Sequence, residues 1–553
     1  MKKYKNILLA ITVIAGIFIT GCKKDFFNRP PEDAITIDNF YQTADQVIAS
    51  TNNLYSAPWF GWNGKAGWSI TELAGGNGRT YSSDVVNFGN FSVTNTNFEL
   101  GGAWNSLFIV VAQSNGIINN LPAKVNKSID TSIINNALGE AHLFRALAYF
   151  HLVRVFGNVP IIENSLDYVD NFKINTNPVA DIYKFIINDL KFAEKKCTAK
   201  IRSGNSISQG HVSSGSASAL LAKVYLYMND YTNARAQAEK VINSGEFKLY
   251  GVDIAGKNFA DLFLTANNNN EESIIQLQWA GNGGYGKGNS QQASLAYSGI
   301  ITGTGDGYGV LAPSFDLLDI YDPGDKRRKA TIMLPGDHYP EINQAAGGYT
   351  LPADANSQGT HAQVKKYVVG TPADNGGVGA AQSSANNTYM MRYAEIFLIE
   401  AEAVIAGAQI SNDPVALAAI NKIRTRAGLV NLSVIKRGYY VANSAYDPIN
   451  NPNAPQNLYR DDLLDERRRE FAFENDYWFD LARLDGFNSS THPKAIIIIK
   501  QQDRGASDNS TPPKRYGDGY QKNVTDANFL FPYPATEVAA NPKLSEPPVP
   551  YHF

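Results

Sequence analysis

The most constraining feature of this sequence is a segment, residues 138–156, that is apolar around almost its whole helical circumference. A helix of this kind has no face suited to water, so it lies buried inside a larger structure. Gly157 follows directly and Pro160 lies three residues further on, which is how helices usually end. This segment therefore predicts a mostly helical fold with this helix in its core.

A second pattern predicts two short antiparallel helices. Between residues 213 and 228, apolar or small side chains recur at helical spacing, at Ala217, Leu220, Leu221, Val224, Tyr225 and Met228. A second helix follows Asp230 and carries Ala234, Ala238 and Val241, before a stop at Gly245. A pair of short helices with small residues at their contact resembles a tetratricopeptide repeat.

Other helices are expected on both sides of this pair, at residues 36–55, 104–121, 393–405, 414–426 and 459–473. Asp413 and Pro414 supply a capping residue and a first-turn proline for the fourth of them. Residues 251–387 differ, because they hold a short predicted strand at 273–279 and a glycine-rich stretch at 281–309. We therefore expect a mostly α fold, with a tetratricopeptide-like helical-repeat scaffold and a loop-rich, partly irregular insertion.

The first 22 residues have the form of an export signal. Three lysines precede an apolar run at residues 7–20, which is shorter than the roughly 20 residues that a bilayer span needs. The run ends at Gly21-Cys22, which resembles a bacterial lipobox, so we expect residues 1–21 to be removed and Cys22 to be lipidated. The alternative is an ordinary secretory signal with a chance cysteine. Cys197, the only other cysteine, is expected to be inert.

Composition and motifs argue against several function classes. The 49 basic and 52 acidic residues are nearly balanced, which speaks against nucleic-acid binding. No His-Glu-x-x-His or Gly-x-Ser-x-Gly motif occurs, and we predict no catalytic residue, metal or cofactor. The glycine-rich segment 281–288 imitates a phosphate-binding loop but has Gly288 where a P-loop needs Ser or Thr. Paired carboxylates for glycoside hydrolysis converge only in space, so sequence leaves them open.

A strongly charged helix carries Glu466, Arg467, Glu470 and Glu474 at intervals of three or four residues. We interpret these side chains as scaffold that pairs with the helices containing Arg392 or Arg424. A catalytic carboxylate pair is the alternative.

Five segments, in order along the chain, resemble the SusD/RagB family. They are residues 138–160, 221–226, 392–403 with 420–429, 466–481, and 529–534 with Glu537 and Asn541-Pro542. Asn475-Asp476 replaces a glycine-containing turn, and Glu546-Pro547-Pro548 replaces the usual ending. The resemblance implies a SusD-like fold with an N-terminal part at 22–250 and a C-terminal part at 251–553, which form one compact globular unit after processing.

The same resemblance implies a function. Members of the family are outer-membrane lipoproteins that capture glycans at the cell surface and deliver them to a SusC-like TonB-dependent transporter. We therefore expect an oligosaccharide-binding protein that is lipid-anchored in the outer membrane and faces outward. A peptide-capture lipoprotein of the RagB type is the alternative, and a surface hydrolase is a more distant one.

Ligand contacts are expected from aromatic and planar polar side chains in glycine-rich loops. Aromatic rings stack on the apolar faces of sugars, while Asn, Asp and Arg bind the hydroxyls. The first candidate stretch contains Trp59, Phe60, Trp62, Trp68, Asn77, Arg79, Tyr81 and Asp84. The second contains Trp279, Tyr285, Tyr297, Asp306 and Tyr308. We expect these aromatic side chains to be exposed rather than part of the core.

Overall fold

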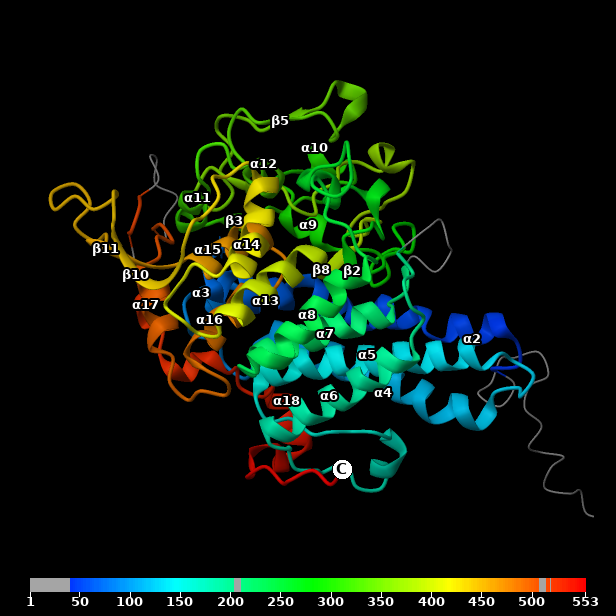
Figure 1. Ribbon diagram of the computed structural model, residues 1–553. Helices are drawn as coiled ribbons and strands as arrows, with labels where there is room; N and C mark the ends of the chain where they lie inside the picture. The colour runs from blue at the N-terminus through cyan, green and yellow to red at the C-terminus, as the bar shows by residue number, and fades with distance from the viewer. Residues whose placement is uncertain (1–39, 203–209, 507–513, 518) are drawn as a thin grey trace, which may run out of the picture.

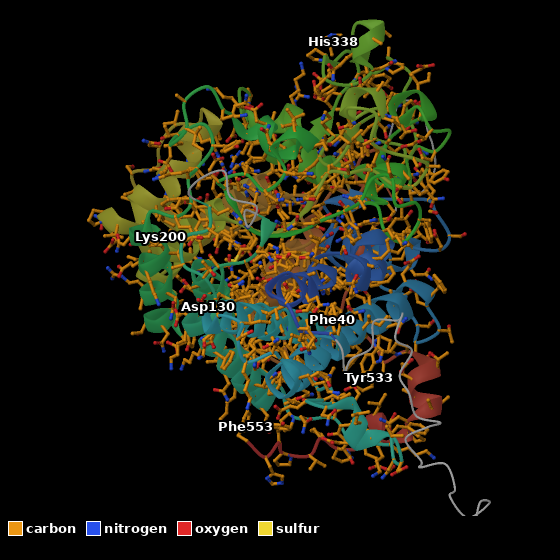
Figure 2. All side chains as sticks on the ribbon, turned by 90° about the vertical axis from the view of Figure 1, so that its right-hand side faces the viewer. Phe40, Asp130, Lys200, His338, Tyr533 and Phe553 are labelled. Atoms are coloured by element: carbon orange, nitrogen blue, oxygen red, sulfur yellow. The ribbon has the colours of Figure 1, made fainter. Side chains whose placement is uncertain are left out.

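The computed structural model describes residues 40–202, 210–506, 514–517 and 519–553. The long helices form a layered array, and the loop-rich residues 251–387 cover one side of it (Figure 1). The view in Figure 2 places His338, in these loops, at the top of the molecule and Phe553 at the bottom. None of the helices in these described ranges is both long and apolar enough to cross a membrane. The signal segment and Cys22 lie outside the described residues.

The array runs in chain order. Its first helices are α4 (Phe98–Lys124), α5 (Thr131–Phe156), α6 (Val179–Lys196), α7 (Ser214–Tyr227) and α8 (Tyr231–Ser244). Each packs against the next, and α8 also packs against α13 (Tyr393–Ile405), which pairs with α14 (Pro414–Ala427). The mostly helical fold built on antiparallel helix pairs is therefore confirmed.

The central helix α5 behaves as its sequence predicts. All of its residues from Gly139 to Phe156 are buried except His142. Asp130 caps its start by accepting a hydrogen bond from the Ser132 backbone N–H, and Gly157 ends it with a φ of 73°. That left-handed backbone is cheap only for glycine, so the sequence determines this helix end.

The predicted helix pair is also confirmed. Ser213 and Ser216 form a reciprocal capping box at the start of α7, and Gly245 ends α8 in the left-handed region. Asp413 caps α14 as expected, by accepting from the backbone N–H groups of Val415 and Ala416. Local capping signals thus fix the ends of the helices that carry the scaffold.

Residues 251–387 form loops joined by very short elements, and their longest α-helix, α11 (Phe315–Ile320), has 6 residues. The strands pair antiparallel: β1 (Gly78–Arg79) with β3 (Ala312–Pro313), β2 (Ser273–Leu277) with β8 (Thr388–Arg392), β4 (Ile332–Met333) with β7 (Gln363–Val364), β5 (His338–Tyr339) with β6 (Tyr349–Thr350), and β9 (Ile410–Ser411) with β10 (Ile435–Ala442). The other short helices are α2 (Ala44–Ser50), α3 (Val86–Gly89), α9 (Gln291–Leu295), α10 (Gly299–Thr302), α12 (Arg327–Thr331), α16 (Tyr477–Ala482), α17 (Pro493–Gln501) and α18 (Ala535–Ala540).

Four predicted helices begin or end elsewhere. Helix α4 begins at Phe98 rather than at residue 104 and ends at Lys124 rather than at residue 121, and α5 begins at Thr131 rather than at residue 138. The other two differ in kind. The helix expected at 459–473 starts as strand β11 (Asn457–Asp461), which pairs with β10, and only then becomes α15 (Asp462–Phe471). Asp461 fixes this boundary, because its carboxylate accepts from the backbone N–H groups of Leu463 and Leu464. Of the helix expected at 36–55, residues 36–39 lie outside the described part, and the rest divides into α2 and the 3-10 turn η2 (Asn52–Tyr55).

The charged residues of α15 lie inside the molecule. Glu470 and Glu466 are fully buried, and they pair with Arg392 and Arg424, each at 2.9 Å. The charges of Arg426, Arg392 and Arg327 outweigh the effect of burial and hold the pKa of Glu470 well below its usual range. The interpretation of these side chains as scaffold is confirmed. Cys197, at the end of α6, is buried and free, and burial raises the pKa of its thiol.

Candidate ligand-binding site

The two candidate stretches lie far apart in sequence but meet in the structure. Asn63 donates from Nδ2 to Asn289 Oδ1 at 3.1 Å, which joins the first stretch to the glycine-rich loops. Phe60 lies between them, because its ring contacts those of Trp279 and Tyr285. The pairing of the two stretches could not be read from either segment alone.

The three tryptophans of the first stretch are buried, so their predicted exposure is wrong. Trp59 and Trp62 are 0% exposed and Trp68 is 3% exposed. The segment contains the helical turns η3 (Ala57–Trp59), η4 (Trp62–Ala66) and η5 (Ser69–Leu73), and it packs on α4. Trp59 and Trp62 are three residues apart and therefore share one face, which contacts the His151 ring of α5. The abundance of glycine had hidden this helical periodicity.

The polar members of the first stretch are committed to the protein itself. Asn77 is buried, donates to Glu72 and accepts from Arg468. Arg79 donates to Ala506 O and to the Tyr81 hydroxyl, and Asp84 pairs with Lys65. These contacts join the N-terminal half of the chain to the C-terminal half. The expectation that Asn77 and Arg79 are available in a binding loop is therefore wrong.

Glu72 lies within the same buried cluster. Burial raises its pKa to about 6, although Asn77 and the backbone N–H groups of Phe473 and Asn475 all donate to its carboxylate. Because these donors surround the carboxylate, it holds two segments of the chain together rather than facing a ligand.

An aromatic platform remains, formed by Phe60 and Tyr285 and supported from below the surface by Trp279. The Phe60 and Tyr285 rings meet edge to face, with centroids 4.8 Å apart and planes at 79°. The Trp279 ring contacts the Phe60 ring, with centroids 6.4 Å apart. Trp279 is only 7% exposed, and its Nε1 donates a hydrogen bond to Thr388 Oγ1. Its expected exposure is therefore wrong as well. Tyr285 is 71% exposed, so it offers most of its ring to solvent.

The backbone explains why Tyr285 projects. It stands between Gly284 and Gly286, whose φ angles are 74° and 89°. One residue before and one after the tyrosine adopt a left-handed backbone conformation, which makes a tight turn that only glycine forms without strain. The segment that imitates a phosphate-binding loop therefore serves to present an aromatic ring.

Tyr308 lies in a second exposed loop, and it is 56% exposed. Its backbone N–H donates to Ala293 O at 2.8 Å, while the neighbouring Asp306 accepts from the Gln382 N–H. The loop at 378–385 also contacts the Tyr285 loop, because Asn289 and Ser384 form a backbone bridge. Both exposed tyrosines are thus carried by loops that rest on 378–385. The sequence analysis missed this supporting loop, since it has neither periodicity nor aromatic residues.

An exposed phenol ring and a half-buried phenyl ring offer planar apolar surface of the kind that stacks on a sugar or another ring. Across residues 40–202, 210–506, 514–517 and 519–553, no group of three or more His, Cys, Asp or Glu side chains could hold a metal ion.

Two family profiles match the chain. The profile described as "SusD family" matches residues 271–551, and the profile described as "Starch-binding associating with outer membrane" matches residues 31–226. Together they cover most of the chain, including both candidate stretches.

Individual proteins agree with these profiles. A "SusD-like protein" of Bacteroides ovatus is 30% identical over 583 aligned positions, which cover 99% of each chain. "SusD-like protein P2" of Formosa agariphila is 26% identical and covers 90% of this chain and 93% of its own. A structure solved with xylogluco-oligosaccharide is 30% identical, covers 92% of this chain and 99% of its own, and has a TM-score of 0.77. The chain belongs to the SusD family.

Proposed function

We propose that this protein captures an oligosaccharide at the outer membrane and does not cleave it. The observation that carries the proposal is the platform of Tyr285 on Phe60, since a 71%-exposed ring fixed by an edge-to-face contact is suited to stacking on a sugar. A similar protein of known structure was solved with xylogluco-oligosaccharide, which supports a glycan ligand. Tyr308 is proposed as a second contact.

The proposal extends to the location and the partner. Cleavage before Cys22 and lipidation of that residue would anchor the protein in the outer membrane, facing outward, with the parts 22–250 and 251–553 as one globular unit. A captured hydrophilic sugar then needs a route inward, which a SusC-like TonB-dependent transporter would supply. The family profile described as associating with the outer membrane supports this location.

Binding measurements on the purified protein test the proposal. Titration calorimetry with xyloglucan, laminarin and malto-oligosaccharides should give saturable binding of at least one of them, and chromatography should recover the sugar uncut. Changing Phe60 and Tyr285 together to Ala should remove the binding step that the platform supplies, because both rings of the edge-to-face pair are lost. The matched control is Phe172→Ala, since this ring is 58% exposed on a different segment and should not affect binding.

Two outcomes would contradict the proposal. Binding of a peptide panel with no binding of any sugar would favour the RagB-like alternative. Cleavage of the bound sugar that purifies with the protein would favour a hydrolase.

A further inference from the structure

A cavity of about 820 Å³ lies away from the aromatic platform. It is enclosed by the β10–β11 hairpin, α11 and α15, which gather on one flank of the molecule (Figure 1). Its volume falls within the range of roughly 300–1,000 Å³ that is usual for small-molecule sites. None of the residues of the platform lines it.

One face of α15 forms part of the wall. Asp462, Asp465 and Arg469 line the cavity, and their spacing of three and four residues places them on the same side of the helix. The hairpin contributes Tyr439 and Val441 from β10 and Leu458 and Arg460 from β11. In each strand these two residues alternate, so they lie on the same face of the hairpin. The wall is thus built from regular elements rather than from loops alone.

Several charged groups on this wall have spare hydrogen-bonding capacity. Arg469 is 8% exposed, and its Nε donates to Ile320 O at 2.7 Å. Its Nη groups reach Asp322 and Glu466 only at 3.5 Å. Arg460 approaches Asp465 through Nε at 2.9 Å, and no hydrogen bond joins its Nη groups to the described part of the chain. Arg469 is buried and the side chain of Arg460 is 24% exposed, so N–H donors of both guanidinium groups are available to a ligand in the cavity.

Asp465 supplies a complementary acceptor. Its side chain is 15% exposed, and burial raises its pKa to about 6 despite the nearby Arg460. The neighbouring arginine does not fully offset the cost of burying this carboxylate, so a ligand hydroxyl that donates a hydrogen bond to it would stabilise its charged form.

The charge balance identifies the ligand class. Five aspartates and four arginines line the cavity, so its formal charge is −5 + 4 = −1. An anionic ligand would be repelled by the excess of carboxylates. A cationic ligand would compete with the arginines that already pair with these carboxylates. Hydroxyl groups suit both signs, because each one can donate to a carboxylate and accept from a guanidinium.

We propose that this cavity is a second binding site for a neutral oligosaccharide, held by Arg460, Asp465 and Arg469 and independent of the Phe60–Tyr285 platform. Two separate sites would let one molecule hold a longer glycan at two points, which raises the overall affinity without any new contact. The ligand class rests on the proposed function, but the site itself does not.

Hydrogen exchange in the full-length protein distinguishes the two sites. The probes are xyloglucan, laminarin, malto- and manno-oligosaccharides at millimolar concentration, added to the Phe60→Ala, Tyr285→Ala double variant. At least one probe should slow exchange in peptides covering residues 435–442 and 457–469. When Arg460→Met and Asp465→Asn are added, the probe concentration needed for the same protection should rise at least tenfold. The control is Lys436→Met, which removes an exposed charge on the same hairpin that does not line the cavity and should leave the protection unchanged.

Each result decides one claim. Platform binding in the wild type without any protection at 435–469 overturns the second site and leaves the proposed function intact. Protection at 435–469 in the platform variant upholds the second site, whereas sugar affinity that is the same in this variant as in the wild type contradicts the platform. Tighter binding of a uronic-acid oligosaccharide than of every neutral probe overturns the assigned ligand class.

Discussion

Arg392 donates from Nη1 to Glu470 at 2.9 Å, and neither side chain has any exposed surface. The same guanidinium reaches Glu272 at 2.7 Å, and Arg426 pairs with Glu272 and Glu470 in turn. These residues come from β8, α14, α15 and the segment before β2, so this buried network ties the helical array to the loops that carry the platform.

The first prediction concerns the stability of this network. Glu470→Gln removes the charge that Arg392, Arg426 and Arg327 share, and breaking a buried pair in this way typically costs about 3–5 kcal/mol. Denaturant unfolding should show a loss of this size. Glu239→Gln is the control, because its pair with Arg235 is solvent-exposed and should contribute less than about 1 kcal/mol. Equal effects of the two substitutions would contradict the structural role of the network.

The second prediction concerns acid sensitivity. Burial disfavours the charged form of Glu402, but the charges of Arg483 and Arg437 outweigh it and lower its pKa to about 2 from the ordinary 4.5. A group whose pKa is lower in the folded state contributes stability above its unfolded pKa and loses it as pH falls through the folded value. The free energy of unfolding should therefore decrease between pH 4.5 and pH 2.

Glu402→Gln should reduce the slope of that decrease, measured by denaturant unfolding at several pH values. Glu537→Gln serves as the control, because the half-buried Glu537 forms no ion pair within the described ranges. If the Glu402 variant keeps the full wild-type slope, the low pKa of Glu402 is wrong.

The sequence determined the long helices well for a physical reason. Helix α14 starts and ends where short-range signals place it, at Asp413 with Pro414 and at the left-handed Gly428. Capping is local, so it can be read from consecutive residues. The boundary at Asp461 failed because strand β11 depends on pairing with β10, which is distant information.

The candidate site was less predictable because exposure depends on neighbours that are remote in sequence. Trp62 looked like a loop residue among glycines, yet helix α5 covers it, while Tyr285 in a similar composition projects into solvent. Nothing in either segment distinguishes the two. Phe60 and Tyr285 contact each other although they are 225 positions apart in the sequence. Their contact could therefore be found only from the three-dimensional structure.

The third prediction separates these two kinds of aromatic residue. Trp62→Ala should lower stability by about 3–5 kcal/mol, as expected for a buried tryptophan. Tyr285→Ala should barely change the melting temperature but weaken sugar binding by about 1–3 kcal/mol, roughly 5- to 150-fold in Kd. Calorimetry of unfolding and of binding on both variants measures this. A large melting loss in the Tyr285 variant with unchanged binding would reverse the assignment of the two rings.

The fourth prediction concerns the anchor. Cys22→Ser removes the thiol to which a lipid would be attached, so labelling with palmitate should disappear and the protein should leave the membrane fraction. Cys197→Ser is the matched control, because that thiol is buried at the end of α6 and should not be acylated. A Cys22 variant that stays labelled and membrane-bound would show that the lipobox interpretation is wrong.

The last prediction concerns the partner. Under the proposed function, capture of a hydrophilic sugar is useful only if another protein moves the sugar inward. A stable contact with a barrel transporter would bury at least about 1,200 Å² in total, which survives mild detergent. Affinity purification of the tagged protein should therefore recover a TonB-dependent barrel in near-equal amount, quantified by mass spectrometry. The Cys22→Ser variant, expressed in the same cells, controls for non-specific recovery of outer-membrane proteins, because it should lose the anchor that brings the two together. Recovery of the wild-type protein alone, under conditions that keep a known pair of this type intact, would contradict the partnership.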